Sequence, residues 1–192
     1  MTKLYFIAAL SLLISCASPT PKQNLHNDHT VFELNKLKPH ADFFAYEKPS
    51  LANANNLESS ERFLSLNGNW KFYWVRSPKD RIQKFYEINL DDADWKTIPV
   101  PSNWEVEGYD YPIYLDERYP FTTTWPDTPE DYNPVGSYRH TFNISKEQMN
   151  DNIILHFAGA KSAMYLYING QFVGYSQGSK TPAEFHINPY VK

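Results

Sequence analysis

The stretch from Ile153 to Ile187 constrains the fold more than any other part of this sequence. It contains two apolar runs, 163–168 and 171–175, that are separated only by Asn169-Gly170. An Asn-Gly pair between such runs is typical of a β-hairpin, because a type I′ turn needs φ > 0 at both central residues. Apolar and tyrosine side chains alternate in the first run, with the period of two that puts one set on each face of a sheet. The sequence therefore predicts a hairpin here, preceded by a strand over 153–157.

A meander of this kind needs a second layer, because its apolar face is not stable in water unless another sheet covers it. We therefore predict an all-β fold with a β-sandwich core. The chain has 192 residues, which is enough for one domain with a core and an additional arm, and hardly enough for two domains.

Composition excludes one class of partner and suggests another. The net charge is −4 and no block of Lys or Arg is present, whereas nucleic-acid binding normally needs a concentrated basic patch. Aromatic residues make up 16% of the chain, with 14 Tyr, 12 Phe and 5 Trp. Tyr and Trp suit half-buried strand surfaces, and they also suit sugar binding, since a pyranose presents a flat C–H face to an aromatic ring. At any one position, packing in the core is the commoner role.

The first residues are predicted to be an export signal, over residues 1–15. Lys3 supplies a positive start, and Leu4 to Ile14 form an apolar run that is too short to span a bilayer. The run ends in Leu-Ile-Ser-Cys16, which resembles the lipobox of bacterial lipoproteins, in which the Cys is acylated. Cleavage after Ala17 by an ordinary signal peptidase is the alternative. We expect an exported bacterial protein, periplasmic or anchored to the outer membrane, that touches the membrane only through a lipid on Cys16.

Cys16 is the only cysteine, so no intrachain disulfide and no Cys-ligated zinc site can form.

Three further segments follow the signal. Residues 16–29 are polar and contain Pro, which predicts a flexible tether. Residues 30–61 are predicted to form an extended arm and a loop or short surface helix. The arm must pack on a surface, of its own domain or another, because it has too many large apolar side chains to leave exposed: Phe32, Leu34, Leu37, Phe43, Phe44 and Tyr46. The β-sandwich domain is predicted to occupy 62–192.

Local patterns predict further elements inside that domain. Strands are expected at 70–75 and 136–144, and Ser77 followed by Pro78 predicts a short helix over 77–85. Pro99 and Pro101 cannot donate to a central ladder, so 97–104 is expected to be an edge segment or a loop.

The stretch 108–134 is long, rich in Tyr and Pro, and irregular, which is typical of functional loops. Its aromatic side chains either line a carbohydrate groove, pack on another domain, or pin the loop to the sandwich: Tyr109, Tyr111, Tyr114, Trp125 and Tyr132.

Titratable side chains give no catalytic constellation. Paired acids occur in turn-like or Pro-rich stretches and are interpreted as solvated loop charges: Asp91, Asp92, Asp94, Asp116, Glu117, Asp127, Glu130 and Asp131. The histidines have no metal-ligand spacing, and no metal site is predicted: His26, His29, His40, His140, His156 and His186. No phosphate loop or dinucleotide motif is present.

Several motifs, taken in order, resemble the amino-terminal part of glycoside hydrolase family 2 enzymes of the β-galactosidase type. They cover roughly residues 31 to 192 and are specific in combination: Pro39-His40-Ala41, Leu64-Ser65-Leu66-Asn67-Gly68-Asn69-Trp70, Val100-Pro101-Ser102-Asn103-Trp104, Tyr119-Pro120-Phe121, Asn133-Pro134-Val135-Gly136, Ser162-Ala163, Asn169-Gly170, Val173-Gly174-Tyr175-Ser176 and Glu184-Phe185. The resemblance implies the family's jelly-roll sugar-binding domain, which is galactose-binding-domain-like, and it implies hydrolysis of terminal β-galactosides by the full-length enzyme.

The resemblance also implies what these residues lack. Family members continue through an immunoglobulin-like domain into a barrel with two catalytic glutamates, which in retaining enzymes lie roughly 5–5.5 Å apart. We therefore expect no catalytic residue in this chain, a domain that is incomplete at its C-terminus, and no cofactor here, since the magnesium and sodium of the family bind elsewhere. Expected partners are a galactose-containing glycan and the downstream domains or a partner chain.

One binding residue is implied by position. In the family, the loop before the Ser-Ala of the hairpin reaches the mouth of the active site, and here that loop places Lys161 there. An ammonium group can donate to a sugar hydroxyl or pair with a carboxylate. Lys161 is alternatively a solvated loop charge.

Three hypotheses remain at this point. The chain is the non-catalytic domain of an exported β-galactosidase-type enzyme, a standalone carbohydrate-binding lipoprotein, or a fragment that docks onto a partner chain through an unpaired strand edge.

Overall fold

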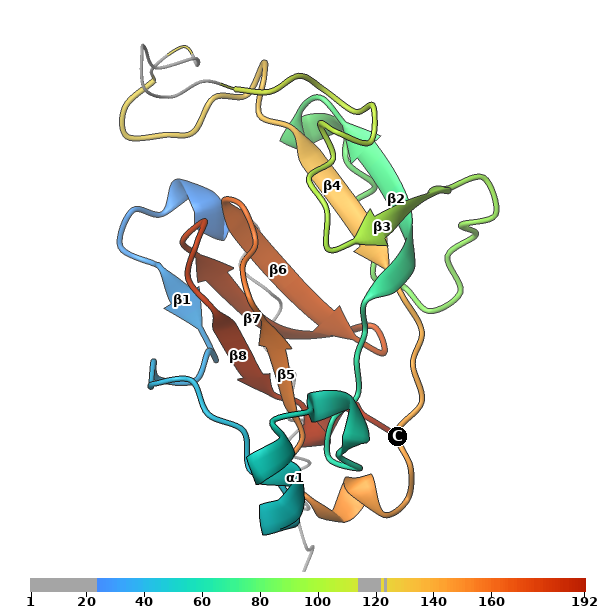
Figure 1. Cartoon of the computed structure of the whole chain (residues 1–192). Coiled ribbons are helices and arrows are strands. Elements are labelled where there is room, and N and C mark those ends of the chain that lie inside the picture. Colours follow the sequence, from blue (N-terminus) through green and yellow to red (C-terminus); the bar gives the residue numbers. More distant parts are fainter. Residues whose placement is uncertain (1–23, 114–121, 123) are drawn as a thin grey trace, which may run out of the picture.

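The computed structural model describes residues 24–113, 122 and 124–192, and these fold mainly into antiparallel strands (Figure 1). The strands are β1 (Glu33–Leu34), β2 (Gly68–Val75), β3 (Lys96–Val100), β4 (Val135–Arg139), β5 (Ile154–Phe157), β6 (Ala163–Ile168), β7 (Gln171–Gln177) and β8 (Ala183–His186). They form sheets in the orders β1-β7-β6, β3-β2-β4 and β5-β8. The one α-helix within the described ranges is α1 (Pro49–Ala54), and short 3-10 turns lie at Leu25–Asn27, Leu57–Ser59, Pro78–Asp80, Gln148–Asn150 and Asn188–Tyr190. The prediction of an all-β fold is confirmed.

The predicted hairpin is formed by β6 and β7. Its turn has φ of 50° at Asn169 and 79° at Gly170, so both central residues are left-handed, as a type I′ turn requires. The antiparallel register runs from Ala163 opposite Gln177 to Ile168 opposite Gln171, with one irregularity after Leu166. On its other edge β7 pairs with β1 of the arm. β7 is therefore the central strand of its sheet.

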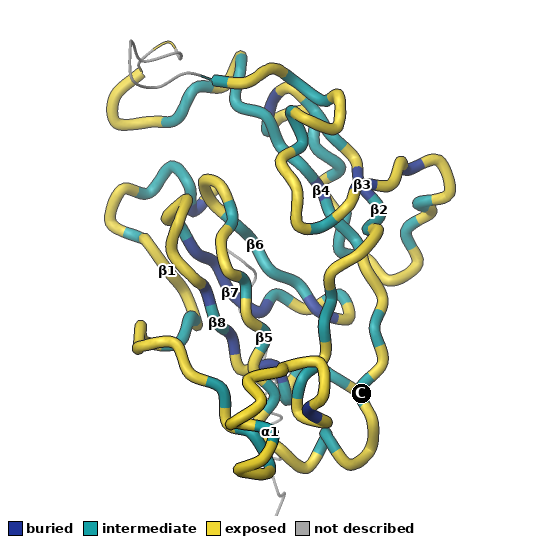
Figure 2. Tube along the Cα trace, viewed as in Figure 1, coloured by how far each residue is buried: buried dark blue, intermediate teal, exposed yellow. Residues whose placement is uncertain are grey.

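The core lies between this sheet and the β5-β8 sheet. Phe185 of β8 is completely buried, and its ring lies against Gly174 of β7. The surrounding cluster is apolar and includes Ile168, Val173, Ala183 and Ile187. Figure 2 shows that buried positions follow β7 and β8. A close contact of this kind needs a residue without a side chain at position 174.

The β3-β2-β4 sheet has its own aromatic core around Phe72, which is 1% exposed. Its ring contacts Trp104, Tyr109 and Tyr138 at centroid distances of 6.2, 4.8 and 4.7 Å. β3 is an edge strand and contains Pro99, which has no N–H to donate. The prediction of an edge segment at this place is confirmed.

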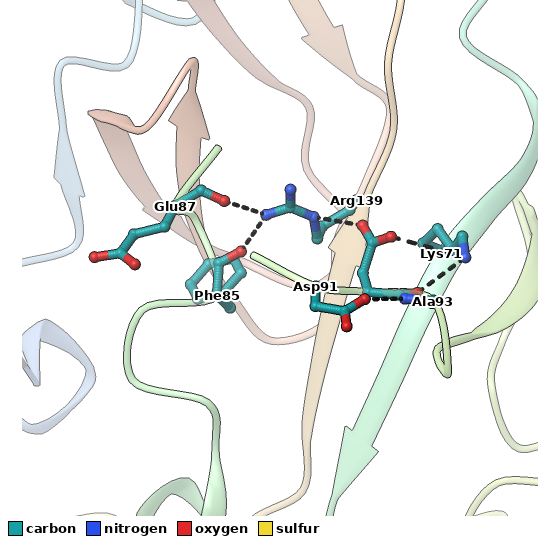
Figure 3. Close-up of polar contacts among 7 residues, drawn as sticks. Lys71, Phe85, Glu87, Asp91, Ala93 and Arg139 are labelled. Atoms are coloured by element: carbon teal, nitrogen blue, oxygen red, sulfur yellow. Dashed lines mark hydrogen bonds and ion pairs between the residues drawn. The ribbon is translucent and has the colours of Figure 1, made fainter. Parts of the chain in front are cut away.

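Residues 78–94 connect the second sheet to the hairpin. Arg139 of β4 donates to the carbonyl oxygens of Phe85 and Glu87, at 2.5 and 3.0 Å, and to Asp92 Oδ2 at 2.9 Å (Figure 3). On the far side of the segment, Tyr86 stacks on Tyr167 of β6, with ring centroids 4.3 Å apart. One guanidinium thus fixes an irregular segment through a fork of charge-assisted hydrogen bonds.

The arm packs on its own domain, which is one of the two surfaces expected for it, but the expectation that its large apolar side chains are covered is wrong for Phe32 and Phe43, which are 65% and 76% exposed. Besides the β1–β7 pairing, Leu37 N donates to Glu184 O at 2.9 Å and Asn35 Nδ2 donates to Val173 O at 2.8 Å. The 49–61 stretch contains α1, in agreement with the expected short surface helix.

A flexible tether was expected over 16–29, but residues 24–29, which are the described part of it, pack on the domain. Leu25 is 2% exposed, and His26 lies beside Tyr165 of β6, with Nδ1 2.9 Å from the hydroxyl oxygen. A single apolar residue that finds a place in the core is sufficient to dock a polar segment, because its burial stabilises by about 1.5–3 kcal/mol.

The predicted helix over 77–85 is wrong beyond its first turn. Only Pro78–Asp80 is helical, as a 3-10 turn, and Ser77 does not cap it. The Ser77 hydroxyl instead donates to the Glu130 carbonyl oxygen, in a buried position. A long-range hydrogen bond therefore replaces the local cap. The strand predicted over 136–144 is also shorter, since β4 ends at Arg139.

Replacing Gly174 with Ala should destabilise the chain by about 2 kcal/mol, because overpacking a core forces its neighbours to move. A Cβ atom there would lie 2.5 Å from the Phe185 ring and 2.6 Å from the Leu34 carbonyl oxygen. The free energy of unfolding, measured by urea denaturation of the full chain, checks this.

Gly159→Ala is the matched control, since its Cβ would meet only the Ser179 carbonyl oxygen at 3.6 Å. It should leave stability unchanged or slightly raised. Equal stability of both variants would show that Phe185 does not press on β7.

Candidate functional site

Two loops meet at the end of the hairpin sheet. The 158–162 loop joins β5 to β6, and the 178–182 loop joins β7 to β8. They are hydrogen-bonded to each other, because Gly178 N donates to Ser162 O at 3.1 Å. Gly178 has φ of +116°, a conformation that side chains disfavour, and the space of its missing Cβ is taken by Thr181. This turn brings the second loop back beside the first.

Each loop carries an exposed lysine, Lys161 in one and Lys180 in the other. The Lys161–Ser162 peptide bond is cis. Within the described ranges neither ammonium group has an ion-pair partner. The loop end is therefore a positively charged rim, able to donate to hydroxyl oxygens or to pair with an anion. The predicted binding residue Lys161 lies in this rim.

A carboxylate between two histidines lies directly behind the rim. Glu184 of β8 is opposite His156 of β5 in the register, and His40 reaches it from the arm. The distances are 2.6 Å from His40 Nε2 to Glu184 Oε2 and 2.9 Å from His156 Nδ1 to Glu184 Oε1. The side chain of Glu184 is 19% exposed, whereas those of the histidines are 41% and 45% exposed. We call these three residues the His-Glu-His cluster.

Both ring nitrogens of His40 face acceptors. Nδ1 lies 2.8 Å from the Ala41 carbonyl oxygen, and Nε2 faces the Glu184 carboxylate. Only the imidazolium form donates from both nitrogens, so this geometry requires protonated His40. The Ala41 carbonyl and the Glu184 carboxylate accordingly raise the pKa of His40 above 6.5. Burial opposes ionisation of Glu184, but hydrogen bonds from His156 and His40 outweigh it and lower the pKa of the carboxyl group below 4.5.

The His-Glu-His cluster is suited to fastening the arm and not to acid–base catalysis. Both oxygens of Glu184 are engaged by histidines, and a general base needs an oxygen that faces the substrate. Throughout the described ranges, no group of three or more His, Cys, Asp or Glu side chains is placed to hold a metal ion.

The acidic residues that were predicted to be solvated loop charges lie outside the lysine rim and the His-Glu-His cluster. Asp92 pairs with Arg139, and Asp91 accepts from Ala93 N at 3.1 Å. Asp131 lies 4.0 Å from Lys79 in an exposed pair. Asp92, at 28% exposure, is therefore a structural anchor and not the solvated charge that we expected. Asp116 and Glu117 lie outside the described residues.

The aromatic residues of the long loop divide into different roles. Tyr109 contacts Phe72 in the second core, so it pins the loop. Tyr111 is 53% exposed and stacks on Tyr132, while Trp125 is 80% exposed. Tyr114 lies outside the described residues, as does Cys16, the predicted lipid attachment point.

Sequence reasoning missed the His-Glu-His cluster, because its members are distant in the chain. His156 lies 28 residues from Glu184, and His40 lies 144 residues from it. A weak signal was present: His40 and Glu184 each belong to a motif quoted above, although nothing in the chain links the two motifs.

None of the helices in the described part of the chain has the length and apolar character needed to cross a membrane.

The folded chain is an all-β domain of antiparallel sheets, with its candidate site in loops at one sheet end. Residues 63–192 match the family described as "Glycosyl hydrolases family 2, sugar binding domain". The chain belongs to this family, as a sugar-binding domain.

The chain is similar in sequence to proteins that are named β-galactosidase. The chain is 39% identical over 171 residues to the β-galactosidase of Priestia megaterium and 38% identical over 170 residues to that of Vibrio cholerae. These matches cover 87% and 88% of this chain but only 16% of each relative. The "Beta-galactosidase large subunit" of Latilactobacillus sakei is 35% identical over 84% of this chain and 28% of its own length. The chain thus spans a small part of the relatives that it matches.

Among solved structures, the β-glucuronidase of Bacteroides uniformis is similar at a TM-score of 0.48. The sequence identity is 25%, over 67% of this chain and 13% of that chain.

The His40–Glu184 contact should fasten the arm only below a limiting pH. Because the folded state raises the pKa of His40, its contribution is complete below pH 6.5 and is lost as the pH rises through the folded value. The contribution of Glu184 has the opposite sign: it is present above pH 4.5 and is lost as the pH falls through the lowered pKa. His40→Gln should therefore lower the melting temperature at about pH 6 and leave it unchanged at about pH 9.

Glu184→Gln is the control, since it removes the carboxylate that faces His40 Nε2. In the Glu184→Gln background the effect of His40→Gln on the melting temperature should differ less between the two pH values than in the wild-type background. An effect of His40→Gln that is equal at both pH values would contradict a protonated contact.

Proposed function

We propose that this chain is the amino-terminal carbohydrate-binding and scaffold domain, a jelly roll, of a β-galactosidase-type glycoside hydrolase. The observation that carries the proposal is the family match over 63–192, together with relatives of 35–39% identity that are all named β-galactosidase. In the full-length enzyme the reaction would be hydrolysis of terminal β-galactosides, and the catalytic carboxylates would come from outside these residues.

The part of this domain in the reaction would be to complete one edge of the substrate pocket. The rim of Lys161 and Lys180 supports this, because it presents unpaired donors at a loop end that the His-Glu-His cluster and the arm hold from behind. Loops on a rigid sheet are where binding groups are usually placed. Lys161 would donate to a galactose hydroxyl, and its positive charge would favour substrates that carry a carboxylate or sulfate nearby.

Export and lipid anchoring are a separate part of the proposal. The apolar run before Cys16 and the lipobox-like sequence support cleavage after Ser15 and acylation of Cys16. The protein would then act in the periplasm or at the outer membrane, on glycans that reach that space.

A second candidate is a complementing chain that docks onto a partner carrying the barrel. It is supported by the outer edge of β6, which has no strand partner within the described ranges, and by an open cleft of about 3110 Å³ whose extensive lining includes residues of β4, β5 and β6. An unpaired edge beside an open cleft is a place where a strand of another chain can add. A standalone binding lipoprotein is the remaining alternative.

The mass and the activity of the native protein distinguish these proposals. It should be captured from its own cells with antibodies raised against residues 24–192, weighed by intact mass spectrometry, and assayed with p-nitrophenyl β-D-galactoside. We expect a mass several times the 22.4 kDa of this chain, lacking residues 1–15 and carrying acyl groups, with hydrolysis of the galactoside. Recombinant Met1–Lys192 should not hydrolyse it.

A native mass near that of this chain, without hydrolysis, would overturn the leading proposal. Co-capture of a separate catalytic chain would support the docking candidate, and its absence would leave the standalone binding lipoprotein.

A further inference from the structure

Residues 24–28 are docked on the outer face of the hairpin sheet, just ahead of β1 in the chain (Figure 1). Met164 and Leu166 of β6 pack against the core, so Tyr165 between them points to the opposite face. His26 contacts the Tyr165 hydroxyl there, and the neighbouring Leu25 is buried. We call residues 24–28 the docked segment.

His26 uses the Tyr165 hydroxyl twice. Its backbone N–H donates to the hydroxyl oxygen at 3.1 Å, and its Nδ1 lies 2.9 Å from the same oxygen. The two rings meet edge to face, with centroids 6.1 Å apart. Because the oxygen already accepts from the backbone, the single hydroxyl hydrogen is available for Nδ1, which accepts it only while it carries no proton. Protonation of Nδ1 would remove this acceptor, so the contact favours the neutral imidazole.

The surroundings of the ring also oppose its protonation. His26 is partly buried, and the positive charge of Arg81 acts on it from the segment that connects the two sheets. Arg81 is held in place by a hydrogen bond from Nη1 to the Pro78 carbonyl oxygen at 2.6 Å. Burial, followed by the charge of Arg81, lowers the pKa of His26 below 6.5. The geometry and the electrostatics therefore favour the same neutral form.

Other titratable groups lie close to His26 in the chain or on the elements that pack around it. The carboxylate of Asp28 accepts from the N–H and the hydroxyl of Thr30, at 3.1 and 2.6 Å. The remaining neighbours are uncharged or exposed: Tyr175 behind Tyr165, Thr128 of the long loop, and the exposed Asp127 and His29. Arg81 is therefore the charged group that acts on His26.

The docked segment also ties the long loop to the hairpin sheet. Asn27 Oδ1 accepts from Thr128 N at 3.2 Å and from the Thr128 hydroxyl. Two residues further on, the Glu130 carbonyl oxygen accepts from Ser77, which follows the second sheet. Release of the docked segment would therefore separate Thr128 from the hairpin sheet and leave the Ser77 contact in place.

We propose that the docked segment is released in acid: protonation of His26 breaks its contact with Tyr165, and residues 24–28 leave β6 together with the Asn27–Thr128 contact. Release would uncover Tyr165, lengthen the connection between Cys16 and the domain, and let the long loop move independently of the hairpin. Because docking favours the neutral imidazole, it is complete above pH 6.5 and is lost as the pH falls through the lowered pKa of His26. This property goes beyond the proposed function and does not depend on it.

Amide hydrogen exchange of the full chain, followed by NMR at about pH 8 and about pH 5, tests the proposal. Protection is corrected for the exchange rate of an unfolded chain at each pH. For the amides of His26 and Thr128 it should be about fivefold lower at the acidic pH, since each loses one hydrogen bond. Leu37, which donates to Glu184 O, should stay protected there, because protonated His40 fastens the arm in acid.

Three variants identify the cause of the release. His26→Gln replaces the titratable ring with a neutral amide, so the protection of Thr128 should be the same at both pH values. His29→Gln is the matched control, since His29 is exposed in the same stretch, and it should keep the pH dependence of the wild-type chain. Leu25→Ala should release the docked segment at both pH values, because it removes the buried side chain.

The amides of β7 report on the fold as a whole and should stay protected at both pH values. Equal protection of His26 and Thr128 at the two pH values in the wild-type chain would overturn the proposal. An undiminished pH dependence in His26→Gln would overturn it too, as would a parallel loss of protection in β7, which would show acid unfolding of the whole domain. None of these outcomes involves hydrolysis or sugar binding, so failure of the proposed function is a separate result.

Discussion

The structure depends on the burial of both edges and one face of β7. Its edges are hydrogen-bonded to β6 and to β1 of the arm, and Phe185 covers its inner face at Gly174. Because a bare glycine lies under a fully buried aromatic ring, the two sheets approach more closely than side chains on both would allow. The arm, the hairpin and β8 are therefore parts of one core, although they come from opposite ends of the chain.

The candidate binding surface lies at the end of a sheet for a physical reason. Sheets are rigid because their backbone groups are paired, whereas loops that leave them can carry side chains chosen for binding. At the end of the hairpin sheet, the His-Glu-His cluster holds the arm against β8 next to the loops of the lysine rim. Arg139 fixes residues 78–94 to β4, and Tyr86 of this segment stacks on Tyr167 of the hairpin, so the segment connects the two sheets.

Local patterns predicted the elements whose cause is local. The Asn169-Gly170 turn and the edge position of Pro99 follow from backbone conformation and from the missing proline N–H, and both were correct. The helix after Ser77 failed because its hydroxyl bonds to Glu130, 53 residues away. Docking of Leu25 and the meeting of His40 with Glu184 likewise depend on contacts between distant residues, which no short window of sequence contains. The motifs predicted which loop carries Lys161, but the neighbours of that loop, such as Lys180 and the His-Glu-His cluster, could be identified only from the fold.

We propose that the lysine rim of this family 2 sugar-binding domain borders a galactoside pocket in the full-length protein. Hydrogen–deuterium exchange of the captured native protein, with and without isopropyl β-D-thiogalactoside, tests it most directly. We predict slower exchange in residues 158–162 and 178–182 when the galactoside is bound, because ligand contact stabilises the loops that carry Lys161 and Lys180. Unchanged exchange in both loops, with protection elsewhere in the protein, would contradict the claim and place the pocket away from this rim.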